Sequence, residues 1–441
     1  MMRSMFSGVS GLRAHQTRMD VIGNNVANVN TVGFKSGRVT FQEIFSQTLK
    51  GASSPDAATG RGGTNPMQIG LGLGVGAVDT ITTRGSLQRT DNPTDMSIEG
   101  DGFFICKGGS ADTFKFTRAG NFGIDKLGNL VTGSGLNVYG WQALKTDGSG
   151  DFDAEKPIEP INLYSDAYRN KRIIAAKATS TAELSGNLDA SKAVALLEAP
   201  TADEIFSVPM TVYDKLGNDY KVTVEFNKEQ INVGAPTSLT TTDWTWTITS
   251  GAGSGISTTA SGDLNFNAGG MITNAGTPTT VSFAPTASAT GTGSFDVSFD
   301  FSKVTMFAAD NSVKPKSVDG YPSGSLVTFS IGSDGILTGI YDNGQQQSLG
   351  LMSISGFENP SGLQKVGDNM YIPTTNSGDY KAVRAGSNGV GTLNPGTLEM
   401  SNVDLSKEFT EMIITQRGFQ ANSRIITTSD EMLQELVNLK R

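Results

Sequence analysis

Both ends of the chain carry a long apolar stripe with a seven-residue repeat, and no other feature constrains the fold as strongly. Apolar residues there recur at steps of three, four or seven, the spacing of a helix face that packs against another helix. The N-terminal stripe comprises Met5, Val9, Leu12, Met19 and Val26, and the C-terminal stripe comprises Leu405, Phe409, Met412, Phe419, Ile426, Leu433 and Val437. Because one-sided helices are not stable alone in water, we expect each stripe to be covered by another helix.

The sequence leaves two partners open for these helices. They could close on each other as an ordinary helical hairpin, or they could join neighbouring copies of the chain. Stripes at both termini, on either side of a β-rich interior, favour the second interpretation, in which the terminal helices are an assembly device.

The interior of the chain is predicted to be β throughout. Short runs alternate between apolar and polar residues, as in Tyr220–Phe226, Trp244–Ile248 and Phe295–Phe301, which is the period of a strand with one buried face. Turn sequences such as Leu216-Gly217-Asn218 separate the runs. Residues 234–300 are more than half Ser, Thr and Gly, a composition that also suits a disordered linker. The alternating aromatic residues favour sheets with flexible loops.

We therefore predict a mixed fold that is mainly β, with inner and outer β domains and long N- and C-terminal α-helices that pair as a coiled coil. Segments rich in Gly, Ser and Pro with little apolar content mark the connectors. From the ends inward, the predicted division is a terminal helical domain (1–30 and 400–441), connector segments (31–70 and 366–399), an inner β domain (71–150 and 308–365) and an inserted outer β domain (151–307).

Composition excludes many kinds of chemistry. The 441 residues include one Cys and one His, so the chain has neither an internal disulfide nor a multi-cysteine or two-histidine metal site. A net charge of −9 argues against a protein that coats nucleic acid. No run approaches the roughly 18 apolar residues of a membrane helix, and the N-terminus lacks the apolar core of a cleaved secretory signal. We predict no catalytic residue, no cofactor and no metal.

Four features resemble chemical motifs but lack the necessary context. Gly72–Ala77 fits a loose dinucleotide-binding pattern, yet β-branched residues follow it where a helix should begin. The acidic run Asp147–Glu155 has Phe152 where a calcium loop needs its glycine, which favours a solvated turn. His15 has no acidic or nucleophilic neighbour in sequence and is predicted to be a packing or interface residue, not a base. Cys106 ends an apolar run and is predicted to be buried.

Several longer phrases carry a family likeness. The stretch from Asn24 to Lys35, NNVANVNTVGFK, resembles the signature of the flagellar rod and hook proteins. Phrases that are similar to later parts of the same family, in the same order, are Gly100–Phe104, Thr117–Gly120, Phe357–Leu363, Ser401–Leu405 and Gln416–Arg424. The resemblance singles out the connector positions Ala27, Asn28, Asn30, Thr31, Gly33 and Phe34.

Within this family the length favours a hook subunit. Rod proteins resemble the terminal helices with one small β domain, whereas this chain inserts a further domain, in which Val212–Asn218 is similar to the outer domain of hook proteins. The resemblance implies a structural subunit that self-assembles into a flexible curved tube and transmits motor torque from rod to filament. The alternative within the family is a distal rod subunit of the flagellar basal body.

The resemblance also implies partners and a location. The chain would form a homo-oligomer, a helical tube of many copies, and would meet flagellar rod proteins, the hook cap protein and hook–filament junction proteins, with no nucleic acid. It would leave the cell through the flagellar type III export apparatus, without a cleaved signal peptide, to the hook and basal body of the bacterial flagellum. A different class, a soluble carbohydrate-binding or hydrolytic β protein, would need exposed aromatic platforms, for which Trp244 and Trp246 are the candidates.

Overall fold

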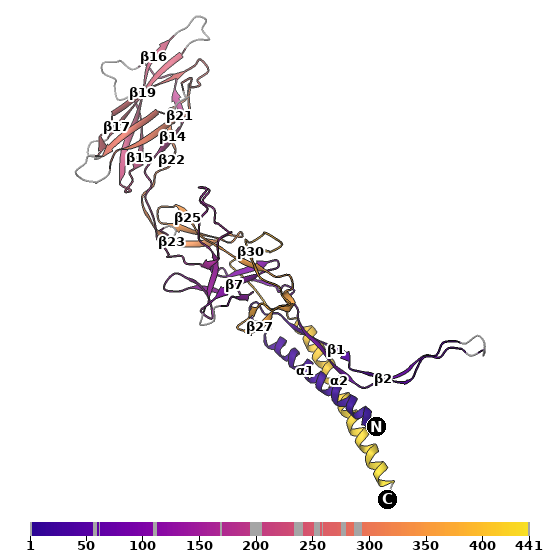
Figure 1. Ribbon diagram of the computed structural model, residues 1–441. Helices are drawn as coiled ribbons and strands as arrows, with labels where there is room; N and C mark the ends of the chain where they lie inside the picture. Colours follow the sequence, from indigo (N-terminus) through magenta and orange to yellow (C-terminus); the bar gives the residue numbers. More distant parts are fainter. Residues whose placement is uncertain are drawn as a thin grey trace. The chain divides into compact units, whose positions relative to one another are not determined.

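The chain forms two compact units (Figure 1). The first comprises Met1–Tyr168, Phe329–Thr338 and Ser348–Arg441, and the second comprises Arg169–Thr328 and Gly339–Gln347. The computed structural model describes residues 2–55, 60, 62–108, 113–167, 170–194, 205–232, 241–250, 256–257, 259–274, 279–285 and 293–439. The fold is mainly β with one helix near each end, as predicted. No helix in these ranges combines the length and the apolarity needed to cross a lipid bilayer.

Helices α1 (Met2–Ala27) and α2 (Leu405–Asn438) lie side by side in the first unit, which confirms the prediction of two terminal helices. They are antiparallel, because the two chain termini lie at the same end of the pair (Figure 1). The start of α2 is fixed by Asp404, whose side chain accepts hydrogen bonds from the backbone N–H groups of Ser406 and Lys407, the arrangement of a helix N-cap.

Two β-ribbons follow α1 and span residues 37–80, so they extend beyond the predicted connector (31–70) into the segment assigned to the inner β domain. One ribbon packs on α1 where glycines permit close approach, Gly37 against Val21 and Gly72 against Ser10. The antiparallel pairs are β1 (Gly37–Glu43) with β4 (Leu73–Thr80), and β2 (Ser46–Lys50) with β3 (Met67–Gly70).

The body of the first unit is a sheet with the strand order β25-β11-β7-β8-β28-β27. Its core contains Phe103, Phe116 and Tyr371, and the rings of Phe103 and Tyr371 meet edge to face with centroids 5.6 Å apart. The strands of the body are β5 (Leu87–Arg89), β6 (Met96–Glu99), β7 (Phe103–Lys107), β8 (Lys115–Thr117), β9 (Phe122–Ile124), β10 (Leu130–Thr132), β11 (Asn137–Trp141), β12 (Glu159–Pro160), β25 (Gln346–Met352), β26 (Ile354–Gly356), β27 (Gln364–Gly367), β28 (Met370–Ile372), β29 (Lys381–Val383), β30 (Thr392–Pro395) and β31 (Thr397–Glu399).

The second unit packs two sheets over one apolar core, with strand orders β15-β16-β17-β19 and β18-β20-β21-β14-β22. Trp246 of one sheet lies with its ring centroid 5.3 Å from that of Phe301 of the other. The alternating runs predicted as strands are β16, β17 and β21. The strands are β14 (Thr181–Asp189), β15 (Phe206–Tyr213), β16 (Asp219–Asn232), β17 (Thr241–Ser250), β18 (Ile256–Ser257), β19 (Thr259–Phe266), β20 (Thr279–Pro285), β21 (Phe295–Phe307) and β22 (Lys314–Val318), with β13 (Ile173–Ile174), β23 (Gly324–Ile331) and β24 (Ile336–Tyr341) where the chain passes between the units.

The two units divide the chain differently from the predicted domains. The prediction gave 151–307 to the outer domain, whereas the second unit begins at Arg169 and extends to Thr328. Residue Phe152 is buried in a core cluster of the first unit with Trp141 and Leu351. Strand β22 pairs with β14 inside the second unit. Within 234–300 the described residues include β17, β18, β19, β20 and the start of β21, and residues 234–240, 251–255, 258, 275–278 and 286–292 fall outside the described residues.

Candidate assembly site on the terminal helices

Small and polar residues, together with Ile22, form the contact between α1 and α2. They either touch the opposite helix or are buried beside it, and they recur at steps of three, four or seven, so they form a row along each helix. This contact row comprises Gly8, Gly11, His15, Arg18, Ile22 and Asn25 on α1 and Glu408, Glu411, Thr415, Gly418, Asn422 and Ser429 on α2.

Glycines bring the two helices close together. A Cβ atom built on Gly11 would lie 2.8 Å from Cγ of Asn422, and one built on Gly418 would lie 2.7 Å from Cε1 of His15. Both distances are shorter than a carbon–carbon van der Waals contact. The contact row therefore excludes even alanine at these two positions unless its neighbours move.

Two alanine substitutions in α1 are expected to have opposite effects. Gly11→Ala places a methyl group against Asn422 and should lower the free energy of unfolding of the helix pair by about 1 kcal/mol or more. The new methyl group of Gly23→Ala would have no atom within 4 Å. This substitution should raise the free energy of unfolding by up to about 1 kcal/mol, because alanine is the better helix former. Urea unfolding followed by helical circular dichroism measures both, and two changes of the same sign would contradict the close approach.

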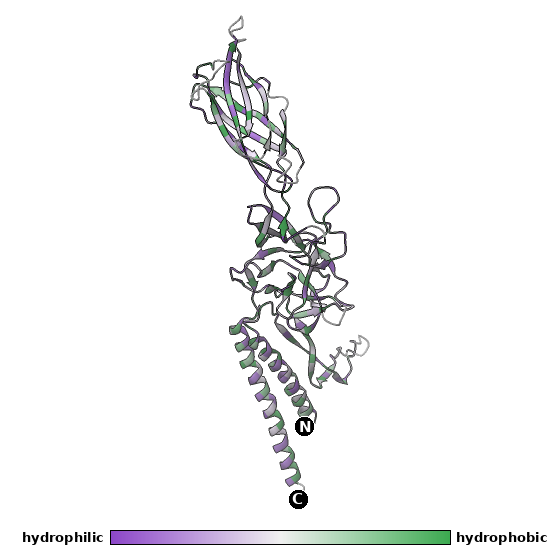
Figure 2. Cartoon of the chain, turned by 90° about the vertical axis from the view of Figure 1, so that its left-hand side faces the viewer, coloured by the Kyte–Doolittle hydropathy of each residue, from purple (hydrophilic) through white to green (hydrophobic). Residues whose placement is uncertain are grey.

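The predicted apolar stripes lie one residue further along each helix than the contact row. Gly8, Gly11 and Arg18 of the row precede Val9, Leu12 and Met19 of the stripe, and the same shift separates the row from the stripe on α2. One residue is a rotation of about 100° around a helix. The stripes are thus turned away from the contact between α1 and α2. Figure 2 shows that apolar and polar residues are interspersed along both helices.

Within the single chain the stripe residues remain partly or largely uncovered. Ile426 also touches Gly8 across the helix pair. Exposed stripe residues are Val9 (38%), Leu405 (38%), Phe409 (50%), Phe419 (41%) and Val437 (69%); half-buried ones are Met5, Leu12, Met19, Val26, Met412, Ile426 and Leu433. Their coverage by another copy of the chain stays a prediction.

Titratable groups are buried in the contact row. Nδ1 of His15 and Oε2 of Glu408 are buried and make no hydrogen bond to any residue that the structure describes. Burial, followed by the nearby Arg18, lowers the pKa of His15, and burial raises the pKa of Glu408. Arg18 pairs with Glu411 at 3.1 Å. Sequence reasoning followed the apolar stripe and missed this polar row, for which the regular spacing of Gly8 and Gly11 from His15 was the available signal.

Acidification is expected to weaken the helix pair through His15. The pKa of His15 is lowered in the folded chain. Its contribution to the free energy of unfolding is therefore fully present above the ordinary pKa of 6.5 and is lost as the pH falls through the lowered pKa. Glu408 acts in the opposite sense, since its raised pKa gives a contribution that is present below 4.5 and lost as the pH rises through the raised value. His15→Phe removes only the first effect. Urea midpoints of both proteins from pH 8 to pH 5 should therefore diverge toward acid, and parallel curves would contradict the prediction.

The connector positions singled out by sequence lie where α1 joins the body. Gly33 has φ +69°, and a Cβ atom there would lie 2.6 Å from the backbone nitrogen of Ala119, so only glycine fits. Phe34 is buried, with Nζ of Lys365 5.0 Å from its ring centroid. Thr31 donates to Oδ1 of Asn28 at 3.1 Å, and Nδ2 of Asn28 donates to the carbonyl oxygen of Asn24, in the last turn of α1, at 2.9 Å.

Two of the six connector positions make no such contact. Ala27 and Asn30 are exposed at the end of α1. Their side chains do not take part in the junction with the body, so the structure gives no packing reason for their identity.

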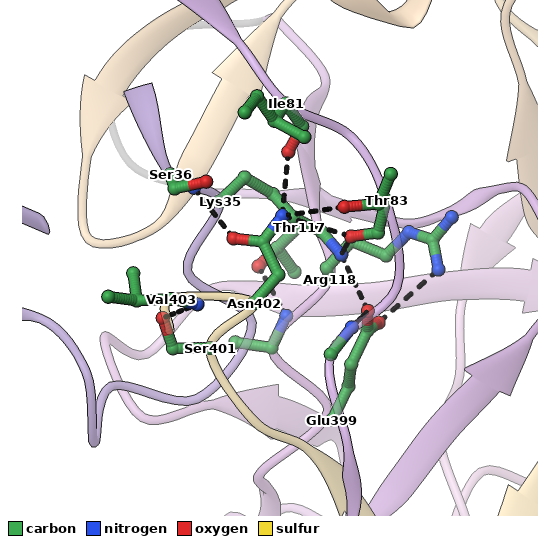
Figure 3. Close-up of polar contacts among 12 residues, drawn as sticks. Lys35, Ser36, Ile81, Thr83, Thr117, Arg118, Glu399, Ser401, Asn402 and Val403 are labelled. Carbon is green, nitrogen blue, oxygen red and sulfur yellow. Dashed lines mark hydrogen bonds and ion pairs between the residues drawn. The ribbon is translucent and has the colours of Figure 1, made fainter. Parts of the chain in front are cut away.

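A buried charge cluster holds this junction together (Figure 3). Oε1 of Glu399 accepts from Nζ of Lys35 at 2.6 Å and from the backbone N–H of Gly85 at 3.1 Å, while Oε2 accepts from Nη1 of Arg118 at 3.3 Å. Burial lowers the pKa of both Lys35 and Arg118. Sequence reasoning did not predict this cluster, although Lys35 and Arg118 stand in two of the family-like phrases.

Asparagines add hydrogen bonds at the same junction. Asn402 donates to the carbonyl oxygen of Ile81 at 2.9 Å and accepts from the backbone N–H of Ser36 at 2.8 Å (Figure 3). Asn25 accepts from the N–H of Gly37 and donates to its carbonyl oxygen, both at 2.9 Å. The start of β1 and the segment before α2 are thereby tied together.

The features that resemble chemical motifs have structural roles. Gly72–Ala77 runs into strand β4 and not into a helix. Asp147 accepts from Ser149, and Asp151 pairs with Arg384 at 3.2 Å. Cys106 is fully buried in β7, where burial raises its pKa to about 12. No group of three or more His, Cys, Asp or Glu residues in the described part of the chain is placed to hold a metal ion.

The two tryptophans do not form a sugar-binding platform. Trp244 and Trp246 are each 1% exposed and lie in the core of the second unit. A carbohydrate platform needs an exposed ring face. The alternative of a carbohydrate-binding protein therefore loses its candidate residues, because the alternating side chains of β17 point into the sandwich.

Known proteins resemble every part of this architecture. Four family descriptions match in order: "Flagella basal body rod protein" at 5–35, "Flagellar hook protein FlgE/F/G D1 domain" at 97–169, "Flagellar basal body protein FlaE D2 domain" at 187–321 and "Flagellar basal body rod FlgEFG protein C-terminal" at 394–439. The chain is 39% identical to the flagellar hook protein FlgE of Borreliella burgdorferi and 38% identical to that of Treponema pallidum, with 100% of both chains covered in each case.

Two further relatives widen the comparison. The flagellar basal-body rod protein FlgG of Bacillus subtilis is 33% identical, with 100% of both chains covered. A crystal structure of the Helicobacter pylori flagellar hook protein FlgE2 matches 71% of this chain and 100% of that chain, at 16% identity and a TM-score of 0.49.

Terminal helices around β units, with these matches along the whole chain, define a structural protein of the bacterial flagellum and not an enzyme. The chain belongs to the family of flagellar hook and basal-body rod proteins. Within that family it is a hook subunit, as predicted, since the hook proteins of two organisms are 39% and 38% identical over the whole chain.

Proposed function

We propose that the chain assembles with copies of itself through the two apolar stripes. The observation that carries this proposal is the exposure of Phe409 and Phe419. These rings lie beside the contact row, where α1 and α2 already pack against each other through small residues. Large exposed apolar patches on soluble proteins mark interaction surfaces. The stripes become inter-subunit coiled-coil seams, and the resulting homo-oligomer is a helical tube.

The antiparallel arrangement of α1 and α2 places both stripes on one face. Each stripe is displaced from the contact row by one residue in the C-terminal direction. Because the helices run in opposite directions, these two rotations of about 100° turn the stripes to the same side of the pair. The hairpin therefore presents a single two-helix apolar face to a neighbouring copy, instead of two faces that point apart.

The remaining assignments rest on the family and on the sequence. The assembled tube is the flexible, curved hook that transmits torque from rod to filament as a universal joint, and it contacts rod proteins, the hook cap protein and hook–filament junction proteins. The subunit reaches the outside of the cell through the flagellar type III export apparatus, without a cleaved signal peptide. The predicted domains and connectors correspond to an inner helical tube, an inner β shell and an outer β shell.

Negative-stain electron microscopy tests the proposal. The purified full-length chain, concentrated in ammonium sulfate, should form curved tubes, and a chain without residues 1–30 and 400–441 should form none. Straight, rigid tubes would favour the alternative of a distal rod subunit. Tubes from the shortened chain would contradict the assignment of assembly to the terminal helices.

A further inference from the structure

One carboxylate at the helix–body junction is shared by segments that lie far apart in the sequence. Lys35 belongs to the segment 31–36 that follows α1, Glu399 belongs to the segment 397–402 that precedes α2, and Arg118 follows β8 of the body. The side chains of Glu399, Lys35 and Arg118 are only 1%, 2% and 3% exposed. Figure 3 shows the carboxylate of Glu399 between the two cations.

The cations outnumber the buried carboxylate. Arg84 adds a third positive charge, which disfavours the charged forms of both Lys35 and Arg118 and lowers the pKa of each, after the larger effect of burial. Asp101 partly offsets the charge of Arg118. Nε of Arg118 is buried without a hydrogen-bond partner among the described residues. The junction thus depends on the negative charge that Glu399 supplies.

We propose that Glu399 is a positioning residue that makes the docking of segments 31–36 and 397–402 onto the body mutually dependent. If 397–402 leaves the body, Lys35 and Arg118 are buried as cations without their carboxylate, which is strongly unfavourable. If 31–36 leaves, Glu399 loses Lys35 and also the hydrogen bond from the N–H of Gly33 to its carbonyl oxygen, at 2.8 Å. Neither helix is then fixed to the body without the other.

Hydrogen exchange of the dilute full-length chain, read by mass spectrometry, tests this coupling. Glu399→Gln should speed exchange at least tenfold in both 397–402 and 31–36, although the second segment contains no substitution. Lys35→Met should likewise speed exchange at least tenfold in both segments, although 397–402 then contains no substitution. The double variant should exchange no faster than the faster single variant, because both changes break one shared contact.

Controls separate coupling from general unfolding. Glu99→Gln changes an exposed carboxylate that accepts from Asn394 at 3.0 Å near the same segments, and it should leave both segments protected. Lys35→Arg keeps the positive charge and should preserve most of the protection. Strands β10 and β11 of the body report whether the first unit remains folded.

The overturning result is a loss of protection confined to the substituted segment. If Glu399→Gln unfolds the whole first unit, Lys35→Met still decides the question, since it leaves Glu399 paired with Arg118. All measurements use the single chain in dilute solution, so their outcome is independent of whether the chain forms tubes.

Discussion

Aspartate at both Phe409 and Phe419 is expected to abolish tube formation. These rings are 50% and 41% exposed in the single chain, and the proposed assembly buries them. Covering a phenylalanine contributes about 1.5 to 3 kcal/mol, and a carboxylate in its place must be desolvated. The double substitution should therefore raise the critical concentration for assembly roughly 100-fold or more. Sedimentation of polymer over a concentration series measures it.

The control for this experiment lies on the opposite side of the same helix. Thr428 is exposed and directly precedes Ser429 of the contact row, so it is turned away from the apolar face. Thr428→Asp should leave the critical concentration within a few-fold of wild type. Equal losses from both variants would show that any added charge on α2 prevents assembly, and the apolar face would lose its special role.

Alanine at Gly33 is expected to detach α1 from the body. A non-glycine residue at φ +69° costs about 1 to 2 kcal/mol, and the new methyl group would lie 2.6 Å from backbone that cannot move aside easily. We expect a total loss of about 3 kcal/mol or more in the free energy of unfolding of the first unit. Urea unfolding and limited proteolysis between α1 and β1 measure the two consequences.

Gly135 is the matched control for this substitution. It has φ +79° in a turn of the same unit, and a Cβ atom there would meet nothing within 4 Å. Gly135→Ala should therefore cost only the conformational part, about 1 to 2 kcal/mol. A Gly33→Ala variant no less stable than Gly135→Ala would mean that the backbone at Ala119 relaxes without cost.

The features predicted from the sequence are those set by local spacing. The strands β16, β17 and β21 followed from the alternation of aromatic and polar residues, because a half-buried strand requires period two. The two helices followed from their heptad spacing. The glycine at position 33 was marked by the family phrase, although the reason for it, a left-handed backbone against Ala119, became visible only in three dimensions.

Contacts between distant segments could not be predicted from such patterns. The second unit extends beyond residue 307 because β22 pairs with β14, a choice that depends on which strand edge is free. Trp244 and Trp246 changed from candidate binding residues to core residues because the second sheet covers their face of β17. The sequence implies that one face of such a strand is buried, but it does not imply which other sheet packs against that face.

By itself the sequence determined the element types, the two apolar stripes and the family. Only the tertiary structure decided that α1 and α2 meet through Gly8, Gly11 and their neighbours, one residue away from the stripes, and that Glu399 joins Lys35 to Arg118 across the chain. The physical reason is that helix periodicity fixes only which residues share a face. Which face packs against the other helix depends on how closely the two backbones can approach and on which charged side chains can pair.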